Sequence, residues 1–252
     1  MQIKVVRREE QANGKLAGGK IEENKPIGFS ADRRTIKPFS NIFFFGNSWT
    51  DVGASLPEHP HQGFEILTYV INGSWEHFDV EQKKWIKYLA GDAQLIKSGS
   101  KFSHAEKLHP NTQIIQIWFD PNLKKSLGTE PQVLMYESND FYQSEVPGKT
   151  VKHLIGEETP IQLDSEDIVL DDYKLAPGLK TFKLRDSHYY CFYILKGEIE
   201  VLDKNLVEDD FMIVRGEKEI DIYVIGHSRL LILESPVRPA YETYLELKAK
   251  KN

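Results

Sequence analysis

The chain has 252 residues, which is enough for two domains of modest size or one large β fold. Hydrophobic residues make up 40% of it and charged residues 28%, as in ordinary globular proteins. The formal net charge of −6 disfavours a surface for nucleic-acid phosphates, so we expect no direct nucleic-acid partner. The single cysteine, Cys191, excludes an internal disulfide and a thiolate metal cluster, which suits a reducing compartment.

Neither a signal peptide nor a membrane span is predicted. The first twenty residues contain no apolar core of the length that a signal peptide needs. The most apolar short run, residues 42–45, is far shorter than the roughly 18 residues of a membrane span. We therefore expect a cytoplasmic protein without a membrane partner.

Short runs of aromatic and β-branched residues alternate with Gly, Pro, Asn and Asp, a pattern typical of many short strands. One helix is predicted near the end, over residues 240–250, where Tyr241, Tyr244 and Leu245 would face inward and lysines outward. The sequence thus predicts an all-β fold with a short C-terminal helix. In chain order the predicted strands are 3–8, 42–49, 64–71, 74–79, 84–89, 93–97, 113–119, 168–175, 179–184, 190–195, 198–203, 211–214, 219–224 and 229–234.

An internal repeat indicates two similar halves. Residues 69–79 resemble residues 193–203 at a constant offset of 124, and residues 91–96 resemble residues 209–214 at an offset of 118. The first match contains Asn72-Gly73, which predicts a two-residue hairpin because both turn positions need positive φ. Strand repeats of this length predict two β-barrels or sandwiches in tandem.

The break between the halves is expected near residues 120–150, where Pro and Gly interrupt the strand pattern. We place one domain at residues 1–130. The second, residues 131–252, would include the terminal helix.

Two short motifs carry the candidate chemistry. His59-Pro60-His61 precedes a predicted strand, and His104-Ala105-Glu106 lies in a later extended segment. Side chains two apart in an extended chain project from the same face, so each motif delivers two ligands into one space. Three imidazoles and a carboxylate without thiolate suit non-haem iron, manganese, copper, nickel or zinc.

The repeat supplies an internal control for this site. His59 and His61 fall opposite Lys183 and Arg185 in the second copy. His104 and Glu106 fall opposite two apolar residues, Ile222 and Val224. We therefore expect one metal ion, in the N-terminal barrel, and none in the C-terminal barrel.

The two motif regions resemble the signatures of the pirin family of cupins. His59-Pro-His-Gln-Gly-Phe-Glu65, continuing to Gly73, is similar to the first signature, and residues 91–118 with His104-Ala-Glu106 are similar to the second. The resemblance implies two tandem cupin-type β-barrels, a bicupin. It also implies one metal in the first barrel, bound by His59, His61, His104 and Glu106. Iron(II) is the expected ion, with nickel, manganese, copper and zinc as alternatives.

The resemblance implies two classes of function. The first is a dioxygenase that opens the ring of quercetin, or of a similar flavonol or aromatic enediol, with O2. Glu106 would then be the general base that takes the substrate's hydroxyl proton. The alternative is a non-catalytic iron-binding, redox-sensing protein that acts through a protein partner. Gly99-Ser-Lys-Phe-Ser103 departs from the Gly-Arg-Gly of most pirins, which bears on the substrate more than on the metal.

Two further residues are assigned supporting roles. Glu65 shares strand parity with His61, and we expect it to support the ligands rather than bind the ion. His77 is assigned a surface or packing role.

Overall fold

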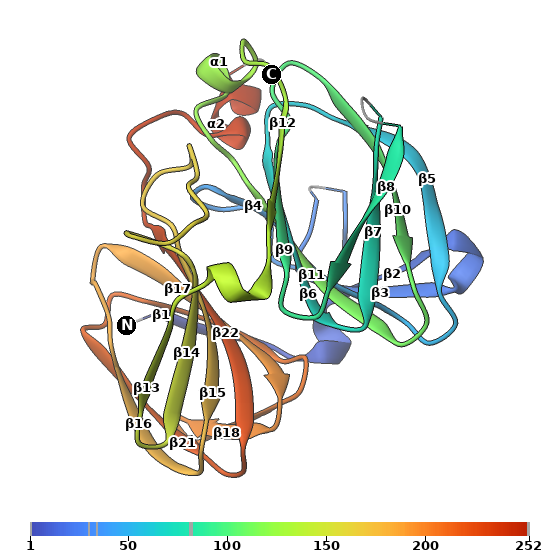
Figure 1. Cartoon of the computed structure of the whole chain (residues 1–252). Coiled ribbons are helices and arrows are strands. Elements are labelled where there is room, and N and C mark those ends of the chain that lie inside the picture. Colours follow the sequence, from blue (N-terminus) through green and yellow to red (C-terminus); the bar gives the residue numbers. More distant parts are fainter. Residues whose placement is uncertain (1, 30, 34, 81–82, 251–252) are drawn as a thin grey trace. The chain divides into compact units, whose positions relative to one another are not determined.

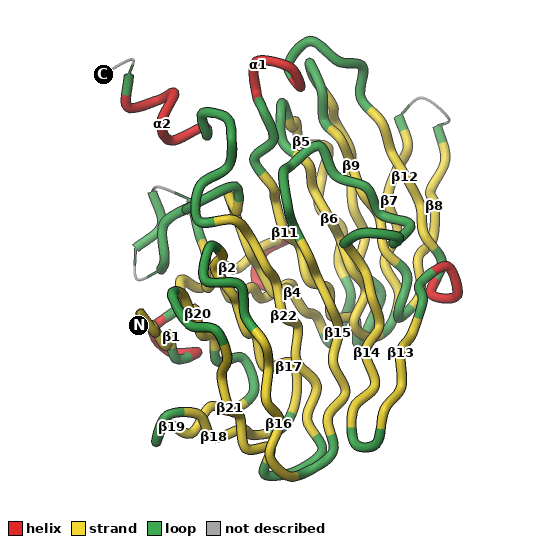
Figure 2. The backbone as a smooth tube through the Cα atoms, turned by 90° about the vertical axis from the view of Figure 1, so that its left-hand side faces the viewer, coloured by secondary structure: helices red, strands yellow, loops and turns green. Residues whose placement is uncertain are grey.

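The computed structural model describes residues 2–29, 31–33, 35–80 and 83–250. It divides into two compact units, each dominated by strands (Figures 1 and 2). The N-terminal unit comprises Gln11–Asp140 with Ala240–Asn252, and the C-terminal unit comprises Phe141–Pro239 with Met1–Glu10. Among the described residues, no helix is long and apolar enough to cross a membrane.

The N-terminal unit consists of two antiparallel sheets and two short helices. The larger sheet has the strand order β12-β9-β6-β11-β4-β3-β2, and the smaller has the order β5-β10-β7-β8. The strands of the larger sheet are β2 (Ala12–Leu16), β3 (Ile21–Ile27), β4 (Ile42–Thr50), β6 (Glu65–Asn72), β9 (Ala93–Lys97), β11 (Thr112–Phe119) and β12 (Gln132–Tyr136). Those of the smaller sheet are β5 (Ala54–His61), β7 (Ser74–Asp79), β8 (Lys84–Leu89) and β10 (Phe102–Leu108), and the helices are α1 (Leu123–Ser126) and α2 (Tyr244–Ala249).

The C-terminal unit repeats this arrangement. Its larger sheet has the order β1-β20-β17-β22-β15-β14-β13, and its smaller sheet has the order β16-β21-β18-β19. The larger sheet contains β1 (Gln2–Val6), β13 (Gln143–Val146), β14 (Lys149–Ile155), β15 (Val169–Leu175), β17 (His188–Lys196), β20 (Phe211–Arg215) and β22 (Ser228–Pro236). The smaller contains β16 (Gly178–Lys183), β18 (Glu198–Val201), β19 (Lys204–Val207) and β21 (Glu219–Val224).

Side chains from both sheets form the core of each unit, so each unit is a barrel. In the N-terminal unit, Val70 and Ile114 of the larger sheet pack with Trp75, Tyr88 and Leu108 of the smaller. The C-terminal core is built likewise from β17, β20 and β22 against β18 and β21. Burial of these apolar side chains on facing sheets is the main stabilising term of such a fold.

Backbone hydrogen bonds confirm the internal repeat. The Val70 N–H donates to the Asp92 carbonyl at 3.0 Å, and the Ile194 N–H donates to the Asp210 carbonyl at 3.1 Å. Each aspartate also accepts from a backbone N–H three residues before it, in Leu89 for Asp92 and in Val207 for Asp210. The two copies therefore share local geometry as well as sequence pattern.

The predicted hairpin at Asn72-Gly73 is wrong. β6 pairs with β9 and β11, whereas β7 pairs with β8 and β10 in the other sheet. Gly73, with φ of 73°, is instead the corner at which the chain passes between sheets. A Cβ atom there would lie 2.6 Å from the Asn111 carbonyl oxygen, so this close approach requires glycine.

The units differ from the predicted division at both chain ends. β1 is the edge strand of the larger C-terminal sheet, where it pairs with β20. In the N-terminal sheet the equivalent edge strand is β12, which pairs with β9. The terminal helix belongs to the N-terminal unit, where the Tyr244 N–H donates to Asp120 Oδ2 at 2.6 Å. The boundary falls after Asp140 rather than after residue 130. These exchanges depend on pairing between distant residues, which strand periodicity does not report.

Every predicted strand range overlaps an observed strand, and the C-terminal helix is confirmed as α2. The missed strands are β2, β3, β5, β10, β12, β13, β14 and β19, and all of these except β12 (QVLMY) contain charged residues. Cys191 is a core residue, because it lies buried in β17 between its cross-strand neighbours Ile213 and Leu233.

Candidate metal centre

Three predicted ligands meet on one face of the smaller N-terminal sheet. β10 lies antiparallel to β5, with His104 directly opposite His59 and Phe102 opposite His61. Along β10 burial alternates, so that His104, Glu106 and Leu108 point inward. A register shift between His104 and Glu106 marks a β-bulge, a feature that re-aims side chains near functional sites.

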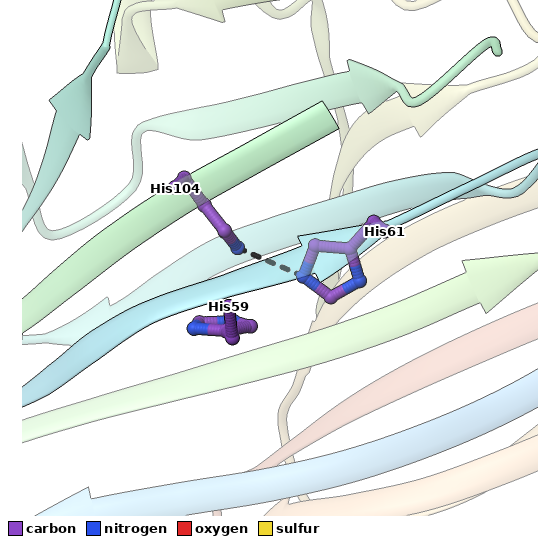
Figure 3. A group of neighbouring side chains, drawn as sticks. All are labelled: His59, His61 and His104. Carbon is purple, nitrogen blue, oxygen red and sulfur yellow. Dashed lines mark hydrogen bonds between the residues drawn. The ribbon is translucent and has the colours of Figure 1, made fainter. Parts of the chain in front are cut away.

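The three imidazoles converge from two strands (Figure 3). Nitrogen atoms of His59, His61 and His104 all lie within 4.8 Å of one another, close enough to share a metal ion. The Nε2 atoms of His61 and His104 are 2.9 Å apart. Two nitrogens that each lie about 2.1 Å from one ion at a right angle are about 3.0 Å apart. The geometry of this pair therefore fits a common ion.

The protonation of His59 also fits a ligand role. Its Nδ1 lies 2.9 Å from the carbonyl oxygen of Pro57, which can only accept a hydrogen bond. The proton therefore resides on Nδ1 and leaves a lone pair on Nε2. That Nε2 faces Glu106 Oε2 at 3.8 Å, so a lone pair and a carboxyl oxygen point at one another. A cation between them would satisfy both groups.

Glu106 adjoins the three histidines but lies outside the group whose ligand atoms are within 4.8 Å of one another. Its carboxyl group is buried, and Oε1 accepts from Gln116 Nε2 at 3.4 Å. Gln116 on β11 is itself oriented by the indole of Trp118, which donates to Gln116 Oε1 at 2.9 Å. The sequence motif identified Glu106 but not this supporting amide.

His77 is a buried neighbour of the histidine group, a position that its assigned surface or packing role did not predict. It is fully buried on β7, directly opposite Glu106 in the strand register. Its Nδ1 lies 3.0 Å from Nδ1 of His104. The assigned surface or packing role is therefore incomplete. The alternation along residues 74–79, with Trp75 and His77 inward, was the signal available in the sequence.

Burial favours the neutral form of the His61, His77 and His104 imidazoles, and neutral imidazole is the form that binds metal. Desolvation lowers the pKa of His61 to about 4, and that of His77 to about 4. It lowers the pKa of His104 even further, with the neighbouring His59 and His61 adding to the effect. Conversely, burial raises the pKa of the Glu106 carboxyl group to about 7. Neutral nitrogen donors beside a buried carboxyl group are a ligand set that suits a divalent cation.

Glu65 points to a different partner. Its Oε1 lies 3.5 Å from Nζ of Lys97, the residue opposite it on β9, and both side chains are largely buried.

At the positions of the C-terminal unit that correspond to His104 and Glu106, Ile222 and Val224 are fully buried apolar side chains. The expectation of one metal site, in the N-terminal barrel, stays a prediction.

Aromatic side chains flank one side of the histidine group. The Trp118 ring meets His61 edge-on, with centroids 4.9 Å apart, and it also neighbours Phe64. Phe64 stacks on Phe43 at 4.2 Å, and Tyr244 of α2 packs against both. We call Phe43, Phe64, Trp118 and Tyr244 the aromatic wall. His59, by contrast, is 35% exposed and is the member of the group that solvent reaches.

Comparison with known proteins identifies the family. A family model described as Pirin matches residues 20–119. A pirin-like protein of Caulobacter vibrioides is 31% identical over 187 residues, which cover 71% of this chain and 77% of that protein. The chain belongs to the pirin family. Another relative, from Pasteurella multocida and provisionally named a quercetin 2,3-dioxygenase, is 30% identical over 183 residues, which cover 70% of this chain and 74% of that protein.

A solved pirin structure has the same fold. The bacterial pirin YhhW of Escherichia coli, in complex with nickel(II), superposes with a TM-score of 0.75 at 20% identity, covering 93% of this chain and 99% of that one. The predicted fold class, two tandem cupin-type barrels with a short C-terminal helix, is confirmed for this pirin. Its histidine group could hold a metal ion.

Proposed function

We propose that this pirin is a metal-dependent dioxygenase that opens the ring of quercetin, or of a similar flavonol or aromatic enediol, with O2. The observation that carries the proposal is the group of three histidines with ligand atoms within 4.8 Å of one another, beside the buried carboxyl group of Glu106. The provisional name of the Pasteurella multocida relative points to the same reaction class. The single buried cysteine agrees with a cytoplasmic setting.

His59, His61, His104 and Glu106 would hold one divalent ion, for which we propose iron(II). When bound, the ion would supply a Lewis-acid centre for the substrate oxygen and O2. The residues of the chain would bind and orient the substrate and would exclude water from it. Trp118 and Phe64 offer aromatic faces and edges against which a planar ring can pack. The exposed edge of His59 is the side from which such a substrate would approach.

Glu106 has the protonation behaviour that this reaction needs. A flavonol must lose its 3-hydroxyl proton before its oxygen can serve as a ligand. A general base works best when its pKa lies near the operating pH, and burial raises the pKa of Glu106 to about 7. Oε2 is the atom we assign to this proton, because Oε1 accepts a hydrogen bond from Gln116, and Oε2 would release the ion to take the proton.

The test combines metal analysis with turnover. The protein is loaded separately with iron(II), nickel, manganese, copper and zinc, and the loss of quercetin's near-visible absorbance is followed together with oxygen uptake. His59→Ala should abolish both metal retention and turnover. Glu106→Gln keeps an oxygen ligand but not the base, so it should retain metal and lose about 10²- to 10⁴-fold in kcat.

His109→Ala is the matched control, because His109 contacts Glu76 on the same sheet and lies outside the histidine group. It should leave both readouts unchanged. Metal binding without oxygen-dependent loss of quercetin, under every metal, would refute the dioxygenase and leave the alternative of a non-catalytic metal-binding protein. Turnover that survives His59→Ala would refute the site.

A further inference from the structure

A row of three cations crosses the larger sheet of the C-terminal unit. Arg229 on β22 lies directly opposite Lys174 on β15 and, at a register shift between Ile194 and Lys196, also pairs with Lys196 on β17. Residues opposite one another in antiparallel strands project from the same face, with Cβ atoms about 4.5–5.5 Å apart. We call Lys174, Arg229 and Lys196 the cation row. Like charges placed in this way repel one another and destabilise a sheet.

Among the described residues, the central member of the row is the one with a carboxylate partner. Arg229 donates to both carboxyl oxygens of the buried Asp172, from Nε at 3.0 Å and from Nη2 at 2.6 Å. Within the described parts of the chain, neither Lys174 nor Lys196 forms an ion pair. Asp172 fixes the direction of the guanidinium, while the two flanking ammonium groups pair with no carboxylate of the described residues.

The same row in the N-terminal unit is uncharged. There the strands β4, β11 and β6 correspond to β15, β22 and β17, and the residues in register are Trp49, Gln113 and Asn72. Even the anchoring bond is repeated, since Gln113 Nε2 donates to Asn47 Oδ1 at 3.0 Å. The barrel fold therefore does not require cations at this level, and the cation row is a property of the second barrel.

The cation row lines a pocket of about 740 Å³. Its wall also contains Lys149 and His227, and Glu145 is the acidic residue among those that line it. The turn between β13 and β14 also lines the pocket, and Leu175, Val146 and Pro147 supply apolar surface. This volume falls within the range of small-molecule sites. A concentration of positive charge is notable in a chain whose net charge is −6.

We propose that this pocket binds a small molecule with two or more anionic groups, such as a sugar bisphosphate or a tricarboxylate. Two anionic groups can each meet a lysine while Arg229 lies between them. Charge-assisted hydrogen bonds of this kind are the strong ones in ligand binding. An anion would also remove the repulsion along the cation row, so binding and folding would reinforce each other. This site is separate from the candidate metal centre and does not depend on the proposed function.

The test is calorimetric titration of the full protein with fructose 1,6-bisphosphate and with tricarballylate, with acetate as the monoanion. We expect one or both polyanions to bind and acetate not to bind, with affinity falling as sodium chloride is added. The polyanion that binds more tightly shows whether the pocket prefers phosphate or carboxylate groups. Failure of both polyanions to bind would overturn the proposal.

The double variant Lys174→Gln/Lys196→Gln should weaken binding at least about tenfold. The matched control Lys204→Gln/Lys218→Gln removes the same charge from exposed lysines of the same unit that lie outside the pocket, and it should bind as the parent does. Equal weakening in both variants would show a net-charge effect and overturn the site.

A second readout separates a ligand site from a structural role. Without ligand, the pocket variant should have a Tm equal to or above that of the parent, because it relieves the repulsion. A clear fall in its Tm together with unchanged polyanion binding would show that the lysines serve the fold, and would also overturn the proposal.

Discussion

The Nδ1 atoms of His77 and His104 lie 3.0 Å apart, so the protonation of His77 and that of His104 are coupled. One of the two atoms must carry the proton. If His104 carries it on Nδ1, its Nε2 keeps a lone pair toward His61 Nε2 and the proposed ion. His77 then carries its proton on Nε2, which has no hydrogen-bond partner among the described residues. His77 is thus a positioning residue for His104.

His77→Leu and His77→Gln test this relationship. Leucine cannot accept the His104 proton, whereas the glutamine carbonyl can. We expect the leucine variant to bind metal about 10- to 100-fold more weakly and the glutamine variant to retain most of the affinity. The measurement is metal competition with a chelator, alongside the Tm of both metal-free variants. Equal affinity in the two variants, with equal Tm, would contradict the tautomer argument.

Asp120 should make the stability of the protein depend on pH. It is buried, its Oδ1 has no hydrogen-bond partner among the described residues, and burial raises its pKa to about 7. Because the pKa is higher in the folded than in the unfolded state, folding favours the protonated form. This contribution is complete below about pH 4 and is lost as the pH rises through about 7.

Asp120→Asn should therefore lose much of this pH dependence and gain about 1–3 kcal/mol in free energy of unfolding over the parent at pH 8. Urea unfolding at pH 5 and at pH 8 measures it. Asp140→Asn, an exposed carboxylate of the same unit, is the control. A stability of the Asp120 variant that falls between pH 5 and 8 as steeply as that of the parent would contradict the assignment.

Glu65 and Lys97 form an ion pair that is largely removed from water, with side chains 2% and 19% exposed. Lys97→Met leaves the carboxylate buried without its cation, and we expect a loss of about 3–5 kcal/mol in free energy of unfolding. The double variant Glu65→Leu/Lys97→Met should recover most of that loss, because no buried charge remains. Urea unfolding of the single and double variants gives the comparison. A double variant no more stable than Lys97→Met would argue against this explanation.

A comparison of Gly197 with Gly216 separates the cost of a left-handed backbone conformation from the cost of a steric clash. Both have positive φ, 91° and 74°, but a Cβ at Gly197 would meet the His227 carbonyl oxygen at 2.9 Å, while one at Gly216 would meet no described atom within 4 Å. Gly216→Ala should cost about 1 kcal/mol, the penalty for a left-handed alanine. Gly197→Ala should cost more. Similar Tm values for the two variants would show that the loop beside Gly197 can move away.

The sequence alone determined the local features of this pirin. Alternating side chains in 74–79 and 219–224 predicted strands at those bounds, because burial on one face imposes a period of two. The offsets of 124 and 118 predicted two equivalent barrels, and the paired hydrogen bonds at Asp92 and Asp210 bear this out. His-x-His and His-x-Glu spacing selected the residues of the candidate site, because neighbours two apart share a face.

Only the tertiary structure decided which distant segments meet. Pairing of β1 with β20 and docking of Tyr244 at Asp120 exchange the chain ends between the units. Asn72-Gly73 was predicted as a hairpin but forms a corner between sheets. His77 lies beside His104, with their Nδ1 atoms 3.0 Å apart. The cation row exists only through register across three strands. Periodicity reports the face that a side chain occupies, whereas its neighbours are set by the packing of the whole sheet.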